Sequence, residues 1–335
     1  MTSSSELEIP IENEKSIFGS RDRYIRQIEK ALDVSLIERN GKLKIVGESA
    51  DVDKTERLIR QLVSLTERGS EISEQSITYA LTLLDESKEN SLGAIDRETI
   101  IHTIAGRPVK PKTIGQRDYV ESIRDRMITF GIGPAGTGKT YLAMAMAIRA
   151  FRNEEISRII LTRPAIEAGE KLGFLPGDLQ SKIDPYLRPL YDALYEIMGA
   201  DSFLKNSEKG LIEVAPLAYM RGRTLDNAFI ILDEAQNTTP AQMKMFLTRI
   251  GFGTKVVVTG DRTQKDLPAD TVSGLDVACR VLGRIDDIGF CELTSRDVVR
   301  HPLVQKIVQA YEKYEERTRA SQAKKPRKRN YDSNR

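Results

Sequence analysis

Short apolar runs alternate with stretches of helical spacing from about residue 106 onward. Five of these runs have the length and composition of strands: 127–132, 158–162, 228–232, 255–259 and 288–293. Because helical stretches separate them, successive strands need crossover connections, which place parallel strands in one sheet with helices on both faces. The pattern predicts an α/β fold built on a mostly parallel sheet.

A smaller α/β unit is predicted before this domain. Apolar residues at helical spacing over 24–32 precede two strand-like runs, 34–37 and 43–46, which Asn40-Gly41 joins as a hairpin turn. Two more helices are expected at 52–65 and 72–84. The domain boundaries that we predict are a disordered, Ser- and Glu-rich lead (1–15), the small unit (16–70), a helical linker (71–105), the large domain (106–314) and a disordered tail (315–335).

Composition narrows the class of protein. Of the 335 residues 40% are hydrophobic and 30% charged, which is typical of a globular chain. Two cysteines are too few for a disulfide framework or a four-cysteine zinc site. The sequence lacks both a signal-peptide pattern and an apolar run of the roughly eighteen residues that cross a bilayer. We therefore expect a cytoplasmic protein with no membrane partner.

The net charge of +2 conceals an asymmetry. Residues 317–335 contain eight Lys or Arg against one acidic residue, a charge of +7, which leaves −5 for the rest of the chain. Such a tail attracts phosphates without reading a base sequence, or merely keeps the chain in solution. The nucleic-acid candidates in it are Lys324, Lys325, Arg327, Lys328 and Arg329.

The most specific motif is a glycine-rich segment between the run 127–132 and a helix-forming stretch. It matches G-x-x-x-x-G-K-[ST] and consists of Gly133, Pro134, Ala135, Gly136, Thr137, Gly138, Lys139 and Thr140, followed by Tyr141. Glycines let backbone N–H groups close around phosphates, and the helix N-terminus faces the same anion. Lys139 would reach the β- and γ-phosphates, and the Thr140 hydroxyl would ligate Mg²⁺. The motif predicts a nucleoside triphosphate site.

Polar residues that suit hydrolysis follow two other apolar strands. Asp233, at the end of 228–232, is placed to ligate Mg²⁺, and Glu234 to orient the attacking water. A kinase must keep water away from the γ-phosphate, so a glutamate that activates water would not help it. The Asp-Glu pair therefore favours hydrolysis over kinase chemistry. Gln264 follows 255–259 and suits a γ-phosphate sensor, although an ordinary strand-to-turn junction has the same pattern. The predicted catalytic residues are Lys139, Asp233, Glu234 and Gln264.

Taken together, the motifs resemble the PhoH family of P-loop ATPases, in the form that couples a KH-like domain to the ATPase. The matching segments are 107–108, 111–116, 133–140, 162–165, 169–177, 219–224, 233–237 and 260–261. The resemblance implies a RecA-like core similar to the first such domain of helicases, with ATP and Mg²⁺ as cofactors. It also implies that Gln116 reads adenine and that Thr162 and Arg163 contact a nucleic-acid backbone, although a strand-end turn has the same pattern.

The resemblance also favours a hexameric ring. A single RecA-like core covers one side of its nucleotide, and hydrolysis usually needs an arginine that neutralises developing charge. We expect a neighbouring subunit to supply it, and the candidates are Arg221, Arg223, Arg296 and Arg300. Residues 16–70 look like a KH fold whose G-x-x-G loop is Gly19-Ser20-Arg21-Asp22. The acid at its last position leaves both RNA clamping and oligomerisation open.

The sequence therefore predicts an Mg-dependent, helicase-like ATPase that acts on single-stranded RNA as a ring. A different class stays open, an ATP-gated assembly factor for an RNA-processing or ribosome-associated protein. The third reading is an NTP-dependent kinase.

Overall fold

The structure is a computed structural model, and it describes residues 2–39, 41–67, 72–85, 99–164, 179–268 and 270–300, and individual positions from 303 to 314. The chain divides into two units, Met1–Val298 and Val299–Arg335. The predicted tail, with its five basic candidates, and the family segment 169–177 lie outside the described residues.

The N-terminal segment is folded, contrary to our prediction. We expected residues 1–15 to be disordered, but β1 (Thr2–Glu8) pairs antiparallel with β3 (Lys42–Glu48) along its whole length, and α1 (Ile11–Phe18) follows. The prediction is wrong because only Leu7 and Ile9 are apolar and buried here, too few to mark a strand in the sequence. The backbone pairing with β3, a segment more than thirty residues away, is not visible in the composition of residues 1–15.

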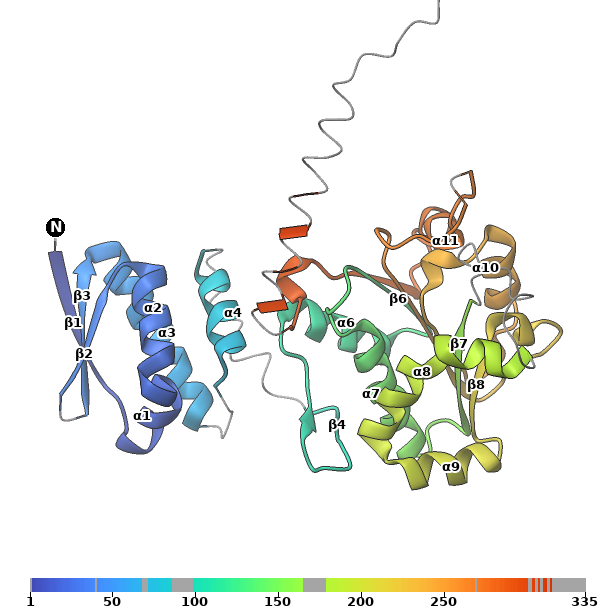
Figure 1. The fold of residues 1–335 in the computed structure, drawn as a ribbon, viewed down its shortest axis with the longest axis horizontal. Helices are drawn as coiled ribbons and strands as arrows, with labels where there is room; N and C mark the ends of the chain where they lie inside the picture. Colours follow the sequence, from blue (N-terminus) through green and yellow to red (C-terminus); the bar gives the residue numbers. More distant parts are fainter. Residues whose placement is uncertain are drawn as a thin grey trace, which may run out of the picture. The chain divides into compact units, whose positions relative to one another are not determined.

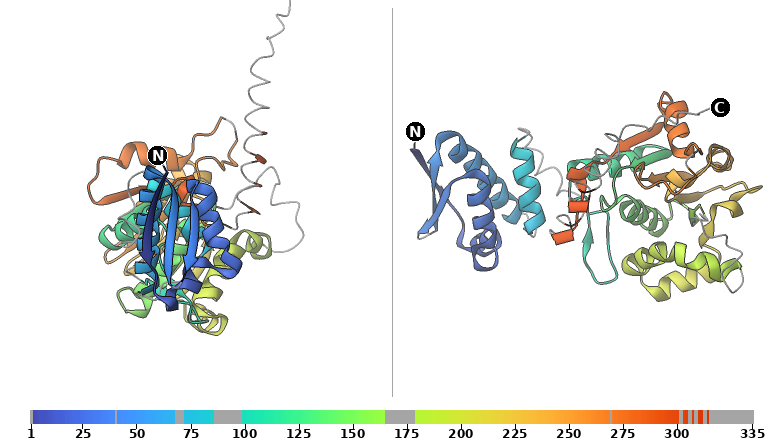
Figure 2. Two further views of the ribbon diagram at one scale, coloured as in Figure 1. Left: turned by 90° about the vertical axis from the view of Figure 1, so that its left-hand side faces the viewer. Right: turned by 45° about the horizontal axis from the view of Figure 1, so that its top comes forward.

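The predicted hairpin is confirmed, since Arg39 at the end of β2 (Ser35–Arg39) pairs with Lys42 of β3. The sheet has the order β1-β3-β2, and helices α2 (Arg23–Leu32) and α3 (Ser49–Glu67) lie on the same side of it as α1 (Figures 1 and 2). Helix α4 (Glu74–Asp85) adds Ile77, Ala80, Leu83 and Leu84 to the same core. The predicted linker 71–105 therefore contains a helix of the N-terminal core.

The loop with the G-x-x-G pattern joins α1 to α2, with a 3-10 turn η1 (Ser20–Asp22) inside it. A Cβ on Gly19 would lie 2.6 Å from the Tyr24 ring, and φ there is +72°, so both space and backbone require glycine. Asp22 stands where the pattern has its second glycine and holds a left-handed φ of 58°. The KH-like assignment of this unit stays a prediction.

The large domain is built on six parallel strands in the order β11-β6-β10-β9-β7-β8. All five predicted strands are confirmed. The six strands of the sheet are β6 (Ile128–Ile132), β7 (Arg158–Arg163), β8 (Ile212–Pro216), β9 (Ala228–Leu232), β10 (Lys255–Gly260) and β11 (Ile288–Glu292). The prediction missed β8, an edge strand whose short run is interrupted by Glu213. Strand β10 lies between β6 and β9, so the ends of these three strands are neighbours.

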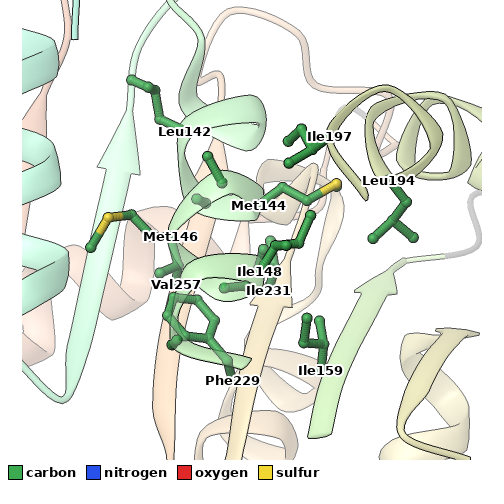
Figure 3. Packing of buried hydrophobic residues seen from close by; sticks show 14 of the residues in the cluster. Leu142, Met144, Met146, Ile148, Ile159, Leu194, Ile197, Phe229, Ile231 and Val257 are labelled. Atoms are coloured by element: carbon green, nitrogen blue, oxygen red, sulfur yellow. The ribbon is translucent and has the colours of Figure 1, made fainter. Parts of the chain in front are cut away.

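Both faces of this sheet are covered, as α/β folding predicts. Phe229 and Ile231 of β9 pack against α7 (Lys139–Arg152) and α8 (Leu179–Met198), where Figure 3 shows Leu194 and Ile197 beside the α7 side chains. Ile230 and Leu232 point to the other face, against α10 (Pro240–Leu247) and α11 (Gly274–Leu282). Alternate residues of one strand thus reach two cores, and this fixes its register.

A short hairpin moves the start of this domain. Ile101 of β4 (Ile101–His102) pairs with Val109 of β5 (Pro108–Val109), and both belong to the core under α7, so the predicted boundary at 105/106 cuts through one element. The remaining elements are α6 (Ile114–Asp125), α9 (Ala200–Glu208) and the 3-10 turns η4 (Leu217–Met220), η5 (Ala235–Asn237) and η6 (Ser295–Asp297). Among the described residues, the structure has no helix whose length and apolar composition suit a bilayer crossing.

Candidate functional site

The predicted site residues meet at the carboxyl edge of the parallel sheet. A cavity of about 270 Å³ opens there, between the loop after β6 and the ends of β9 and β10. Its lining residues are Ala135, Gly136, Gly138, Lys139, Thr140, Tyr141, Asp233, Glu234, Gly260, Asp261 and Gln264. All four predicted catalytic residues line it, which agrees with the rule that open α/β sheets bind ligands at this edge.

The glycine-rich loop takes the backbone path that its glycines permit. Gly136 and Gly138 have φ values of 87° and 77°, and a Cβ on Gly133 would lie 2.4 Å from the Leu293 carbonyl oxygen. The loop leads directly into α7, so its N–H groups and the first turn of that helix face the cavity. The Lys139 ammonium donates to the carbonyl oxygens of Gly133 and Pro134, at 2.6 and 2.9 Å.

Two hydroxyl groups on different elements donate to the same carboxylate oxygen of Asp233. The Thr140 hydroxyl donates to Asp233 Oδ1 at 2.7 Å, and the Thr259 hydroxyl of β10 donates to the same oxygen at 2.7 Å. A hydroxyl and a carboxylate suit Mg²⁺, which keeps several waters and takes few protein oxygens. This agrees with the predicted ligands Thr140 and Asp233. No cluster of three or more His, Cys, Asp or Glu side chains suited to a metal occurs within the described part of the chain.

Arg163 contacts Asp233 and Glu234, called the acid pair below, and the sequence did not predict this contact. Its Nη2 donates to Glu234 Oε1 at 2.7 Å, and its Nε lies 3.7 Å from Asp233 Oδ2. Glu234 holds a left-handed backbone, with φ 53°, which is uncommon outside glycine and often found at functional sites. The residue that we expected on a nucleic-acid backbone therefore contacts both predicted catalytic acids.

Gln236 is the main residue that sequence reasoning missed. It is fully buried, and its amide donates to Glu234 Oε2 and to the Gln264 carbonyl oxygen while accepting from Asp261 N. Asp261 in turn accepts from Ala135 N of the glycine-rich loop at 3.1 Å. One buried amide thus links the acid pair, the segment after β10 and the loop. The sequence placed it in the family-matching segment 233–237 but gave it no role.

Gln116 lies behind the loop and does not line the cavity. Its Oε1 accepts from Lys112 N at 2.7 Å, and its Nε2 donates to the Thr137 carbonyl oxygen at 3.0 Å. Both ends of the amide therefore bond to protein backbone, and the adenine-reading role stays a prediction. The nearby Tyr119 hydroxyl donates to the Lys139 carbonyl oxygen, and complete burial raises the pKa of this phenol well above its usual range.

Tyr141, predicted beside the nucleotide, does line the cavity. Its hydroxyl donates to Glu196 Oε1 at 3.2 Å. Burial, followed by the charge of Glu196, raises the pKa of Tyr141 to about 12. The residue is therefore a neutral donor at physiological pH.

Thr162 corrects a prediction. We expected it to contact a nucleic-acid backbone, but it has no exposed surface, because as an inward-facing residue of β7 it lies inside the sheet. Its hydroxyl has no hydrogen-bond partner among the described residues. The side chain is thus not presented to a macromolecule in this structure.

None of the four arginine-finger candidates lines the cavity of its own chain. Arg223 forms a bidentate ion pair with Glu213 of β8, at 2.6 and 2.7 Å. Arg221 and Arg296 are exposed, and Arg300 is half-buried in the second unit of the chain. Which of the four supplies a finger stays a prediction.

Comparisons with known proteins agree on one family. A family model described as PhoH-like protein matches residues 108–312. The chain is 52% identical over 298 residues to a PhoH-like protein of Bacillus subtilis, covering 89% of this chain and 93% of that one. It is 52% identical over 312 residues to a PhoH-like protein of Mycobacterium tuberculosis, covering 93% and 88%.

More distant proteins match less closely. Protein PhoH of Escherichia coli K12 is 37% identical over 297 residues, covering 88% of this chain and 82% of that one. A solved structure, the Sulfolobus solfataricus SWI2/SNF2 ATPase core in complex with dsDNA, has a TM-score of 0.29 and 16% identity over 44% of this chain and 31% of that one. That likeness is too low to support an argument.

Proposed function

The chain belongs to the PhoH-like protein family, and from that premise we propose that it is an Mg-dependent ATPase. The observation that carries the proposal is the hydrogen bond from Thr140 to Asp233, at 2.7 Å. It brings the phosphate-binding loop and the acid strand to one point, with Glu234 beside it. Such a pairing is what Mg²⁺-assisted hydrolysis of a triphosphate needs.

Each residue has a distinct task in this reaction. The loop N–H groups and Lys139 bind the β- and γ-phosphates, and Thr140 and Asp233 would hold Mg²⁺, which supplies charge neutralisation at the phosphate oxygens. Glu234 orients a water whose oxygen bonds to the γ-phosphorus. The bond from that phosphorus to the β–γ bridging oxygen breaks, the oxygen leaves with ADP, and the water proton passes through Glu234 to solvent or phosphate.

The hydrolysis test compares the wild type with Glu234→Gln and, as a control, with Lys205→Ala, which changes an exposed residue on α9. We expect Mg-dependent release of phosphate that falls by roughly 10²–10⁴-fold in Glu234→Gln. Lys205→Ala keeps the wild-type rate. Equal rates for wild type and Glu234→Gln would contradict the assignment of Glu234.

We further propose that the protein acts on single-stranded RNA in the cytoplasm, as a helicase-like hexameric ring. The charge of +7 on residues 317–335 supports a polyanionic partner. The ring follows from the expectation that a single RecA-like core needs an arginine finger from a neighbouring subunit. Within the described part of the first unit, Arg221, Arg223 and Arg296 do not line the cavity, which is compatible with such a role.

The RNA test compares ATPase rates with and without single-stranded RNA, for the full chain and for a chain that ends at Tyr314. We expect stimulation that weakens as salt rises and is smaller in the shortened chain, because phosphate contacts release counterions. Absence of stimulation at low salt would exclude the RNA motor. It would favour an ATP-gated assembly factor for an RNA-processing or ribosome-associated protein.

One observation favours that second function. The buried Gln236 amide hydrogen-bonds to Glu234 and to the segment after β10, at Asp261 and Gln264. A movement of Glu234 on loss of the γ-phosphate would therefore be passed to that segment. A slow ATPase with this link suits a nucleotide-dependent switch. Slow turnover that RNA leaves unchanged, together with ATP-dependent capture of one protein, is the result that the switch predicts.

A further inference from the structure

We propose that Arg163 is the positioning residue for Glu234, acting within its own chain. It would hold the carboxylate in the orientation that the attacking water needs. The inference rests on the proposed ATPase function. It gives Arg163, which the sequence suggested as a nucleic-acid contact, a task in hydrolysis.

The geometry ties Arg163 to both acids at once. Its Nη2 lies 2.7 Å from Glu234 Oε1, and its Nε lies 3.7 Å from Asp233 Oδ2. The side chains of Arg163, Asp233 and Glu234 are 18%, 9% and 30% exposed, so water screens the pair with Asp233 more weakly than the pair with Glu234. Charge-assisted hydrogen bonds in such surroundings are stronger than those between neutral groups.

Strand register explains why Arg163 reaches this place. In the pairing of β7 with β9, Thr162 lies opposite Leu232, so Arg163 is the next residue on its strand just as Asp233 is on the neighbouring one. Asp233 N also donates to the Thr162 carbonyl oxygen at 2.9 Å. A rigid strand end therefore fixes the arginine beside the acids.

Glu234 is held from both sides. Arg163 donates to Oε1, and the buried Gln236 amide, which follows β9, donates to Oε2. A carboxylate has about four lone-pair positions, so two donors leave room for a water hydrogen. Two donors on different oxygens fix the plane of the group. Without Arg163, only Gln236 would restrain it, next to the like charge of Asp233.

Lysine does not reproduce this arrangement. The planar guanidinium presents Nη2 to one carboxylate and Nε to the other, whereas an ammonium is a single point of charge. We therefore expect Arg163→Lys to lie between the wild type and Arg163→Ala in kcat. A role in bulk charge alone would make Arg163→Lys equal to the wild type.

The decisive experiment is a double-mutant cycle with Arg163→Ala, Glu234→Gln and both together. We expect Arg163→Ala to lower kcat by roughly 10- to 100-fold, with KM for ATP and binding of a fluorescent ADP nearly unchanged. Because Arg163 acts through Glu234, the double variant should be no slower than Glu234→Gln. Multiplied losses, or a kcat for Arg163→Ala at or above the wild-type value, would overturn the proposal.

Arg158→Ala is the matched control, since Arg158 lies at the opposite end of the same strand and contacts the Asp226 carbonyl oxygen. It should keep the wild-type kcat. The wild type and the three variants of the cycle are also compared by urea unfolding, where the shifts in midpoint of the two single variants should not add. Additive shifts would refute the link between Arg163 and Glu234, whether or not the wild type hydrolyses ATP. A wild type without ATPase activity would separately refute the proposed function.

Discussion

The two halves of the nucleotide site are built in different ways. The loop half is one continuous segment, Gly133–Thr140, which runs from the end of β6 into the first residues of α7. The acid half is assembled from the ends of β7, β9 and β10, which lie far apart in the sequence and meet through Arg163, Asp233 and Thr259. The loop half is thus set by local backbone conformation, and the acid half by strand register. The first half should govern nucleotide binding, and the second catalysis.

The largest expected effect on binding and turnover together comes from Lys139→Ala in the loop half. Loss of the ammonium should lower ATPase turnover by roughly 10²–10³-fold and also weaken nucleotide binding, since the charge contacts phosphates in both the ground state and the transition state. Turnover and fluorescent-nucleotide titration measure the two effects. Nucleotide affinity within about twofold of the wild type would break the comparison, because it would make this residue purely catalytic.

The intermediate effect comes from Gln236→Leu in the acid half. The change leaves Asp261 N without its acceptor and Glu234 without one donor, so the free energy of unfolding should fall by about 1–3 kcal/mol. Turnover should drop by about tenfold while nucleotide affinity stays, since no phosphate contact is lost. Urea unfolding and steady-state kinetics test this.

Gln242→Ala is the control for that variant. Gln242 belongs to the capping box of α10 with Thr239, away from the acid pair, so its loss should affect stability alone. If Gln236→Leu weakened nucleotide binding as strongly as turnover, the division of labour between the two halves would fail.

How much of the site could be predicted follows the same division. The loop and the Asp233-Glu234 pair could be predicted from the sequence because each is a short motif that follows an apolar run. Thr259, Arg163 and Gln236 were not, because their contacts depend on which strands are neighbours, and an edge strand such as β8 left a weak signal. The Ser-rich strand β1 was missed for a related reason: its pairing with β3 depends on a distant segment, and its own residues carry little apolar pattern.

The smallest expected effect concerns Tyr141, at the rim of the loop half. Its pKa of about 12 in the folded state exceeds the usual value near 10, so the unfolded chain loses this proton first as pH rises. The stabilisation is complete below pH 10 and is lost between about pH 10 and 12. Unfolding midpoints measured across that window should fall slightly more steeply for the wild type than for Tyr141→Phe. Parallel curves would show that the hydroxyl is not restrained.

The bonds from Lys139 to the Gly133 and Pro134 carbonyl oxygens bear on nucleotide affinity. If phosphates bind Lys139 as we propose, the ammonium exchanges these carbonyl oxygens for phosphate oxygens, so binding is an exchange of partners rather than a simple addition. The measured affinity is then the difference between the two sets of bonds.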